Sequence, residues 1–249
     1  MNTIYDCGIK FNPISVSEIL KVIGELKKLG RRGIQITGVN LEQVAQLEKN
    51  EKFADYVNAS DIVNIDGSIV YWYLKLKGYP IEGRALCADI LYGLLDEAER
   101  KGETVFFLGA TQDIIERLVT DIHQKYPHII ISGYHNGYFD DDAEIVEMIK
   151  SASPTYLFLG MPTPKKEFFI SEYKSVLNAS VCFGVGGMFD ILAGEVNRAP
   201  AWIQKCHMEW LYRISQNPIG HTKRVWRALV PCVKVMWRYR KTPKNQVIE

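Results

Sequence analysis

The sequence has few cysteines, and their positions form no pattern. They are odd in number, widely spaced and nowhere arranged as CxxC, which excludes a disulfide framework or a zinc site readable from spacing. The five are Cys7, Cys87, Cys182, Cys206 and Cys232. The chain also begins without a basic segment followed by an apolar one, so no secretory signal is expected. Together these absences predict a reducing, cytoplasmic location.

Long apolar runs are missing as well. No uncharged apolar run approaches the roughly 18 to 20 residues that span a bilayer, so any membrane contact is expected to be peripheral. There is no internal repeat or low-complexity segment. With 47% apolar, 24% charged and 11% aromatic residues, the chain is not a disordered polymer, and its 249 residues suffice for a sizeable core.

A net excess of charge is absent, but the charges are unevenly distributed. The formal net charge is +1, yet residues 221–249 hold eight basic residues and one acidic residue, while residues 1–220 hold 22 and 28. We therefore predict an α/β body over 1–220 and a basic C-terminal appendage over 221–249, after the turn-forming segment 217–220. An anionic surface should meet the appendage first.

Apolar periodicity indicates alternating strands and helices. Continuously apolar strands are predicted at 34–37, 62–65, 104–108, 129–132, 155–159 and 181–185. A capping box of Ser15 and Glu18 predicts one helix start. Other helices are predicted to begin near Leu41, Gln112, Asp141 and Pro164. This alternation favours a Rossmann-like, mostly parallel sheet with helices on both faces, followed by the basic helical appendage.

Ligands of such sheets normally bind beyond the carboxyl ends of the strands. There, Gly184-Val185-Gly186-Gly187 would let backbone N–H groups approach an anion, although the same glycines would also suit a tight strand-to-helix turn. Gly109-Ala110-Thr111 follows another strand but lacks the spacing of the GxGxxG dinucleotide fingerprint. An NAD-linked oxidoreductase therefore remains an alternative with little support.

Asp66 follows the strand at 62–65, so its carboxylate should enter the crevice, where it could act as a general base. The alternative is a cap for a helix beginning near Ser68. Arg84 could hold a diphosphate in a bidentate manner, or be an ordinary surface charge. Asp140-Asp141-Asp142 precedes a predicted helix, and we interpret it as a cap; we predict no metal site and no cofactor. His207 is interpreted as a packing residue.

The appendage has the clearest pattern. On a helical wheel one face is apolar and holds Trp226, Leu229, Val230, Val233 and Trp237. An adjacent face is basic and holds Lys223, Arg227, Lys234 and Arg238. This pattern is typical of an interfacial helix on an anionic membrane, and Pro231 is expected to kink or divide it. The alternative is that the tryptophan face docks on the body or on a neighbouring subunit. No module accompanies it that would indicate nucleic-acid binding.

Several of these segments resemble the WecG/TagA/CpsF family of glycosyltransferases. The segment GVGGMFDILAG at 184–194, continued by Arg198-Ala199-Pro200 and by EWLYR at 209–213, is similar to the family signature GVGGxFDxLAG…RAP…EWxxR. Further landmarks are Asp66-Gly67, Asn136-Gly137-Tyr138-Phe139, Leu159-Gly160 with Pro164-Lys165, and the spacing from Arg84 to Asp89.

The resemblance implies an inverting, metal-independent transferase that moves an N-acetylmannosamine-type sugar from a UDP-sugar to an undecaprenyl-diphosphate-linked acceptor at the inner face of the cell membrane, in teichoic-acid or other cell-surface polysaccharide synthesis. It implies Asp66 as the base and Arg84 as the group that stabilises the departing diphosphate. The substrate contacts it implies are Thr37, Asn40, Asp89, Gly109, Tyr138, Gly160, Lys166, Glu167, Gly184, Gly186, Gly187, Asp190 and Arg198. Contact with the membrane or with the acceptor diphosphate is expected from Arg224, Arg227 and Arg238.

The chain departs from the family pattern at two places. Lys166 stands where the family usually has glutamine, which changes an amide contact into a cationic one. Thr37 and Asn40 are three residues apart where the family tends to show a spacing of two, so we expect one of the two assignments to fail. A non-catalytic, nucleotide-binding membrane subunit remains a second alternative, and the oligomeric state, a homo-oligomer included, is left open.

Overall fold

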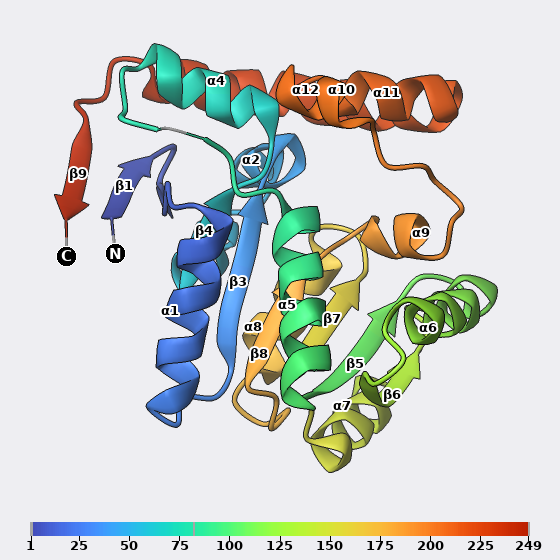
Figure 1. Cartoon of the computed structure of the whole chain (residues 1–249). Helices are drawn as coiled ribbons and strands as arrows, with labels where there is room; N and C mark the ends of the chain where they lie inside the picture. The colour runs from blue at the N-terminus through green and yellow to red at the C-terminus, as the bar shows by residue number, and fades with distance from the viewer. Residues whose placement is uncertain (1, 82, 249) are drawn as a thin grey trace.

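The computed structural model, which describes residues 2–81 and 83–248, is built around a parallel sheet of six strands (Figure 1). Their order across the sheet is β4-β3-β8-β7-β5-β6, and every pairing is parallel. The strands are β3 (Ile34–Val39), β4 (Ile62–Ile65), β5 (Thr104–Gly109), β6 (Ile130–His135), β7 (Tyr156–Gly160) and β8 (Val181–Gly184). The predicted Rossmann-like sheet is thereby confirmed.

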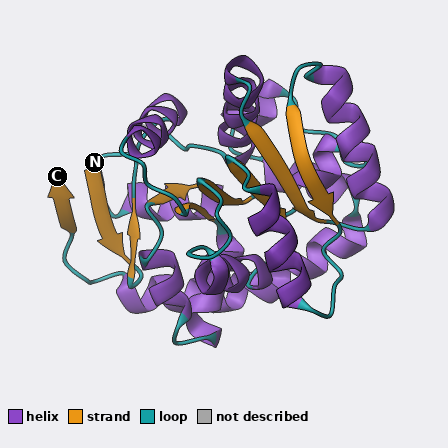
Figure 2. Ribbon diagram, turned by 90° about the horizontal axis from the view of Figure 1, so that it is seen from below, coloured by secondary structure: helices purple, strands orange, loops and turns teal. Residues whose placement is uncertain are grey.

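Helices cover both faces of this sheet (Figure 2). They are α1 (Val16–Lys28), α2 (Leu41–Lys49), α3 (Phe53–Asn58), α4 (Ser68–Leu76), α5 (Cys87–Lys101), α6 (Gln112–Lys125), α7 (Asp142–Ala152), α8 (Lys165–Tyr173) and α9 (Met188–Leu192). Alternate residues of β5 point to opposite faces: Val105 and Phe107 pack with α1, α5 and α6, whereas Phe106 and Leu108 pack with α7 and α8. Burial on both faces explains why the strands are continuously apolar.

Two predicted helix starts are confirmed in atomic detail. The Glu18 N–H donates to Ser15 Oγ at 3.3 Å, and the Ser15 N–H donates back to Glu18 Oε2 at 2.8 Å, which completes the capping box of α1. The Ala143 N–H donates to Asp141 Oδ1 at 2.8 Å, so this acidic triplet caps α7 as interpreted.

A second, antiparallel sheet was not predicted. It has the order β2-β1-β9, from β1 (Asn2–Asp6), β2 (Ile9–Phe11) and β9 (Asn245–Ile248), and it joins the two ends of the chain (Figures 1 and 2). Its strands have three to five residues each, which is too short for a reliable period-two signal. Pairing between chain ends also leaves no local trace in a sequence.

The C-terminal segment forms α10 (Ala201–Lys205), α11 (Glu209–Gln216) and α12 (Pro218–Tyr239). Helix α12 begins three residues before 221 and continues through Pro231, so of the expected kink or division at this proline the division is wrong. The reason is packing: Ala228, Cys232, Val235 and Met236 are buried in a cluster shared with α2–α4 and β1–β4, which holds the helix together on both sides of the proline.

Most of the tryptophan face of α12 is exposed to solvent. Trp226 and Trp237 are 63% and 64% exposed, and Val230 and Val233 are exposed beside them. The alternative in which this face docks on the body of the same chain is therefore wrong for Val230, Val233 and Trp237, whereas Trp226 and Leu229 border a cavity between α12 and the body. A different stripe of the helix is buried. Within the described residues, no helix is both long enough and apolar enough to cross a bilayer.

Candidate active site

A cavity of about 480 Å³ lies beyond the carboxyl ends of β3, β4 and β8, as expected for this class of sheet. Its floor is formed by the loops that follow these strands and by the start of α5. Residues of α11 and α12, the helices drawn at the top of Figure 1, line it from the other side. The C-terminal segment therefore contributes residues to the same cavity as the sheet.

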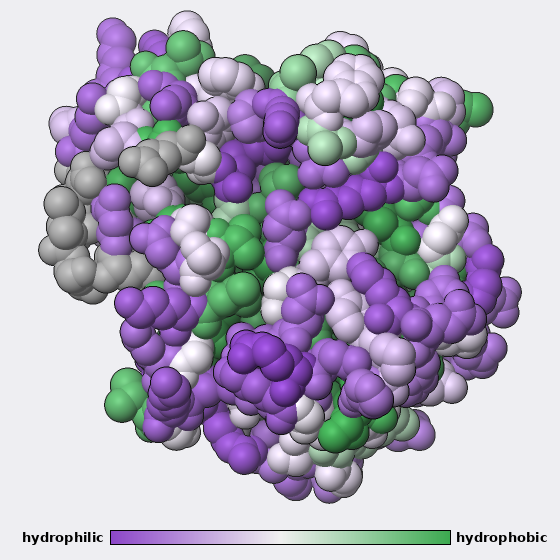
Figure 3. All heavy atoms as spheres, in the orientation of Figure 1, coloured by the Kyte–Doolittle hydropathy of each residue, from purple (hydrophilic) through white to green (hydrophobic). Residues whose placement is uncertain are grey.

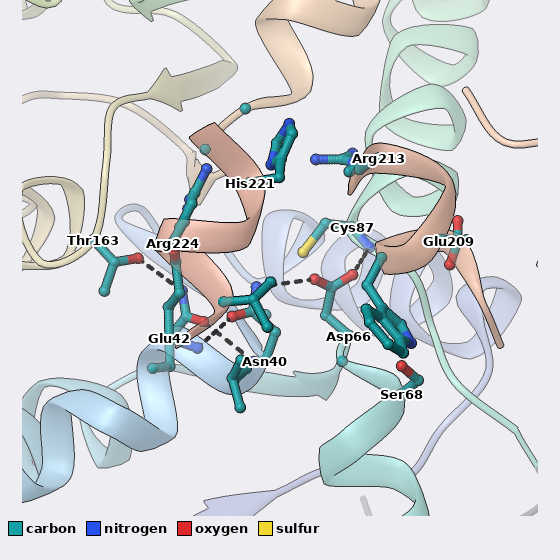
Figure 4. Close-up of a pocket in the computed structure, with 18 of the residues that line it drawn as sticks. Asn40, Glu42, Asp66, Ser68, Cys87, Thr163, Glu209, Arg213, His221 and Arg224 are labelled. Carbon is teal, nitrogen blue, oxygen red and sulfur yellow. Dashed lines mark hydrogen bonds and ion pairs between the residues drawn. The ribbon is translucent and has the colours of Figure 1, made fainter. Parts of the chain in front are cut away.

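Asp66 lies in the wall of this cavity (Figure 4). Its Oδ1 accepts a hydrogen bond from the Cys87 N–H at 2.8 Å, and its Oδ2 accepts one from Asn40 Nδ2 at 3.4 Å. Because Cys87 is the first residue of α5, the carboxylate is also stabilised by the positive end of that helix. The alternative role as a cap of α4 is wrong, since Gly67 occupies the N-cap position and no side chain caps that helix.

Arg84 is held beside Asp66 and is not a surface charge, because its side chain is only 5% exposed. Its Nη1 donates to the Asp66 carbonyl oxygen at 2.8 Å, and its Nη2 donates to Glu209 Oε2 at 3.2 Å. A guanidinium carries five N–H groups, so donors remain for a ligand in the cavity that Arg84 also lines.

His207 accepts a hydrogen bond from Arg84 Nε at its Nδ1, at 3.0 Å. Its ring packs against Tyr71 and Trp72, with centroids 4.8 and 5.6 Å away, so it is the packing residue expected and a partner of Arg84 as well. Burial, followed by the adjacent guanidinium, lowers the pKa of His207. The neutral imidazole that can accept from Arg84 is therefore the favoured form.

Helices α11 and α12 add nitrogen-bearing side chains, of which the sequence predicted Arg224 but assigned no role to Arg213 or His221. Arg213 and His221 line the cavity together with Arg224, whose Nη2 donates to Glu42 Oε2 at 2.6 Å. That hydrogen bond raises the pKa of Arg224. Burial raises the pKa of Asp190, while Arg213 and Arg224 act in the opposite direction. Only a fold that returns the C-terminal helices over the strand ends brings these groups together.

The glycine loop at 184–187 widens the cavity more than it supplies hydrogen-bond donors. The N–H groups of Val185 and Gly186 both donate to the Leu159 carbonyl oxygen, at 2.9 and 3.2 Å, so these two of the loop's N–H groups are not available to an anion. A Cβ on Gly186 would meet nothing within 4 Å, whereas one on Gly184 would lie 3.0 Å from the stem of Lys166. The missing side chains therefore keep the cavity open beside a buried lysine.

Comparison with known proteins agrees with this geometry. Residues 4–246 match the "Glycosyl transferase WecG/TagA/CpsF family". The chain belongs to this family. An "N-acetylglucosaminyldiphosphoundecaprenol N-acetyl-beta-D-mannosaminyltransferase" of Bacillus spizizenii is 33% identical over 82% of this chain and 77% of its own length. Proteins of the same name are 31% identical in Bacillus subtilis, over 86% and 82% of the two chains, and in Staphylococcus aureus NCTC 8325, over 76% of each.

As a WecG/TagA/CpsF-family protein, the chain is a glycosyltransferase, and the oxidoreductase and non-catalytic alternatives lose their basis. Of the residues expected to contact substrate, the structure brings one group to the cavity: Asn40, Asp66, Arg84, Lys166, Gly184, Gly186, Gly187 and Arg224. Thr37 lies outside it, buried with its Oγ1 2.7 Å from Ser60 Oγ, so of the two doubtful assignments only Asn40 has access to a ligand there.

The remaining expected residues of this transferase do not line the cavity. Gly109 and Gly160 face one another at the ends of β5 and β7, and Tyr138 follows β6 with 76% of its surface exposed. Asp89 and Arg198 form an ion pair, and buried Glu167 accepts from Lys166 Nζ at 2.6 Å. Asp190 lies behind Gly187, with its Oδ2 3.5 Å from where a Cβ would be. On α12, Arg227 is exposed and Arg238 pairs with Glu48.

Proposed function

We propose that this glycosyltransferase moves N-acetylmannosamine from a UDP-linked donor to N-acetylglucosaminyl-diphosphoundecaprenol, the acceptor in the names of its relatives. One observation carries the proposal: a single cavity holds a carboxylate, Asp66, together with the cationic side chains of Arg84, Arg213 and Arg224. A base for a hydroxyl group and cations for a diphosphate are the two things that direct sugar transfer requires.

The geometry supports a one-step displacement with inversion. The acceptor hydroxyl oxygen attacks the anomeric carbon of the donor sugar while the bond from that carbon to the UDP diphosphate breaks. Asp66 takes the hydroxyl proton, and the electron pair of the broken bond leaves with UDP. Arg84 and the cations of α11 and α12 stabilise the negative charge that develops on the leaving diphosphate.

We further propose that the helices over the cavity lie on the inner, anionic face of the cell membrane, because the lipid acceptor stays in the bilayer. All five tryptophans are exposed and lie on α4, α10, α11 and α12: Trp72, Trp202, Trp210, Trp226 and Trp237. In Figure 3 the upper edge of the molecule, over these helices, mixes apolar residues and residues of intermediate hydropathy with hydrophilic ones. Tryptophan favours the membrane interface, and basic neighbours favour anionic lipid.

The test is transfer with defined substrates. UDP release should require both UDP-N-acetylmannosamine and a short-chain prenyl-diphosphate N-acetylglucosamine, and the product should be the lipid-linked disaccharide, detected by mass spectrometry. UDP-N-acetylglucosamine serves as the matched donor control. Absence of disaccharide with this pair, or equal transfer from the control donor, would overturn the substrate assignment.

A further inference from the structure

The cationic groups around the cavity are not equally neutralised. Arg84 pairs with Glu209, Arg224 with Glu42 and Lys166 with Glu167. Arg213, in contrast, has no carboxylate within 4.0 Å among the residues that the structure describes. The cavity therefore keeps one unpaired guanidinium on its α11 side, where an anionic ligand would complete the charge balance.

His221 lies next to this unpaired cation (Figure 4). Over the described chain, no side chain or backbone group forms a hydrogen bond with its ring nitrogens. The charged groups that act on it come from four helices: Arg213 of α11, Arg224 of its own helix, Asp190 of α9 and Glu42 of α2. The imidazole thus has unused hydrogen-bonding capacity beside a site that attracts anions.

The protein groups around this imidazole disfavour its charged form. Burial comes first, followed by the charges of Arg213 and Arg224, and together they lower the pKa of His221 despite the opposing carboxylates of Asp190 and Glu42. Since the ordinary value is about 6.5, His221 is neutral at pH 7 before a ligand binds. A diphosphate placed beside it would reverse the local electrostatic balance.

We propose that His221 binds the substrate diphosphate together with Arg213 and takes up a proton from solvent as it does so. This inference rests on the proposed function, in which both substrates carry a diphosphate diester. The two negative charges of the diester offset the repulsion by the guanidinium groups, and the imidazolium then donates from a nitrogen that has no proton in the neutral ring. The proton returns to solvent when the anion leaves.

The diphosphate bound by His221 could belong to the donor or to the acceptor, since both substrates contain one. Two probes distinguish these possibilities. UDP-N-acetylmannosamine carries the donor diphosphate, and geranyl-diphosphate-linked N-acetylglucosamine carries the acceptor diphosphate. Neither diester has a group that titrates near neutral pH. Any proton taken up on binding at pH 7 is therefore bound by the protein, and the probe that causes the uptake identifies the diphosphate that His221 contacts.

The experiment is titration calorimetry of the full chain at pH 7 in several buffers of different ionisation enthalpy. We expect an uptake approaching one proton with one probe, its loss in His221→Gln, and its retention in His128→Gln, which changes an exposed histidine. His221→Arg should bind the same probe with no uptake. Undiminished uptake in His221→Gln would overturn the proposal, as would binding of both probes to the unmodified chain without uptake.

A direct measurement follows the imidazole itself by nitrogen NMR, with the His221 signal assigned from the His221→Gln variant. Its pKa should rise when the probe binds, and each unit of rise makes binding about tenfold tighter below the lower pKa, an advantage lost as the pH rises through the higher one. Binding with uptake but without transfer would refute only the proposed function. Transfer without uptake would refute only the role of His221.

Discussion

At the scale of single residues, the position of Asp66 yields the sharpest prediction. In Asp66→Asn the amide oxygen can still accept from the Cys87 N–H, so the start of α5 should keep its geometry. The base is lost, however, and kcat should fall about 10²-fold or more while donor binding stays within a few-fold. Steady-state kinetics and calorimetry check this. Unchanged turnover would remove Asp66 from the role of base.

Glu209 is predicted to act by positioning Arg84. In Glu209→Gln the guanidinium loses its carboxylate partner but keeps its bonds to Asp66 and His207. We expect a lower kcat with a smaller change in KM, and an effect that is less than additive with Arg84→Lys, with a coupling of about 1–3 kcal/mol. A double-mutant cycle on kcat/KM measures it. Fully additive effects would mean that the two side chains act independently.

His207 should contribute to the loss of folding stability at acid pH. Its pKa is lowered in the folded chain, so the native state binds fewer protons than the unfolded one, and stability should fall as the pH drops below about 6.5 and level off below the lowered pKa. His207→Asn keeps an acceptor for Arg84 and tolerates the φ of 60° found there, but it cannot titrate. Thermal unfolding between pH 5 and 8 should show a weaker acid dependence in this variant. The same dependence in both proteins would contradict the assignment.

At the scale of elements, the parts that could be predicted are those whose signal is local. The strands of the large sheet are continuous apolar runs, and the caps at Ser15 and Asp141 lie next to the helices they begin. Thr37 could not be separated from Asn40, because both lie near the carboxyl end of the same strand. Thr37 is inside β3 and Asn40 follows it, and only the three-dimensional turn decides which side chain enters the cavity. The roles of Arg213 and His221 could not be predicted for a similar reason, since their place in the cavity depends on a long-range return of the chain, whereas Arg224 came from the family resemblance.

Helix α12 illustrates both the strength and the limit of a helical wheel. The wheel correctly grouped Trp226 and Trp237, but it did not single out the stripe of Ala228, Cys232, Val235 and Met236. These two apolar stripes lie on roughly opposite sides of one helix. The smaller residues dock on the body and leave the tryptophans outside, a choice that depends on the shape of the surface beneath.

The exposed tryptophans predict that membrane binding can be weakened by substitutions that leave the stability of the fold nearly unchanged. Trp226→Ala combined with Trp237→Ala should lower sedimentation with anionic vesicles by about tenfold or more, because both side chains favour the interface. The free energy of unfolding should change little, as is usual for exposed positions. Co-sedimentation with phosphatidylglycerol vesicles and chemical denaturation measure the two quantities.

Met236→Ala is the matched control from the same helix. This side chain is buried, so its truncation should cost about 2–5 kcal/mol of stability and leave vesicle binding of the folded protein unchanged. Equal vesicle binding by the double tryptophan variant and the unmodified chain would place the membrane contact elsewhere. Removing all residues after 220 is a poor test, because it would also remove part of the core.

At the scale of the whole molecule, the uneven charge suggests how the enzyme is oriented. The acidic body and the basic C-terminal segment form one folded unit, so an anionic bilayer would attract one side of the molecule and repel the other. The attracted side also carries the five tryptophans and covers the cavity that holds Asp66. Electrostatics and apolar burial would thus present the same face to the lipid acceptor.

The ion pairs on α12 make this orientation testable residue by residue. Within the described chain Arg227 has no ion-pair partner, whereas Arg238 is paired with Glu48 at 2.7 Å. Arg227→Gln should therefore weaken binding to anionic vesicles by about 1 kcal/mol, and Arg238→Gln should weaken it less, because the glutamate already neutralises that charge. The difference should shrink in 0.5 M salt, where the Debye length is only about 4 Å. If both variants lose the same affinity, or if salt leaves the difference unchanged, the bilayer does not act on this face of α12 through its unpaired charge.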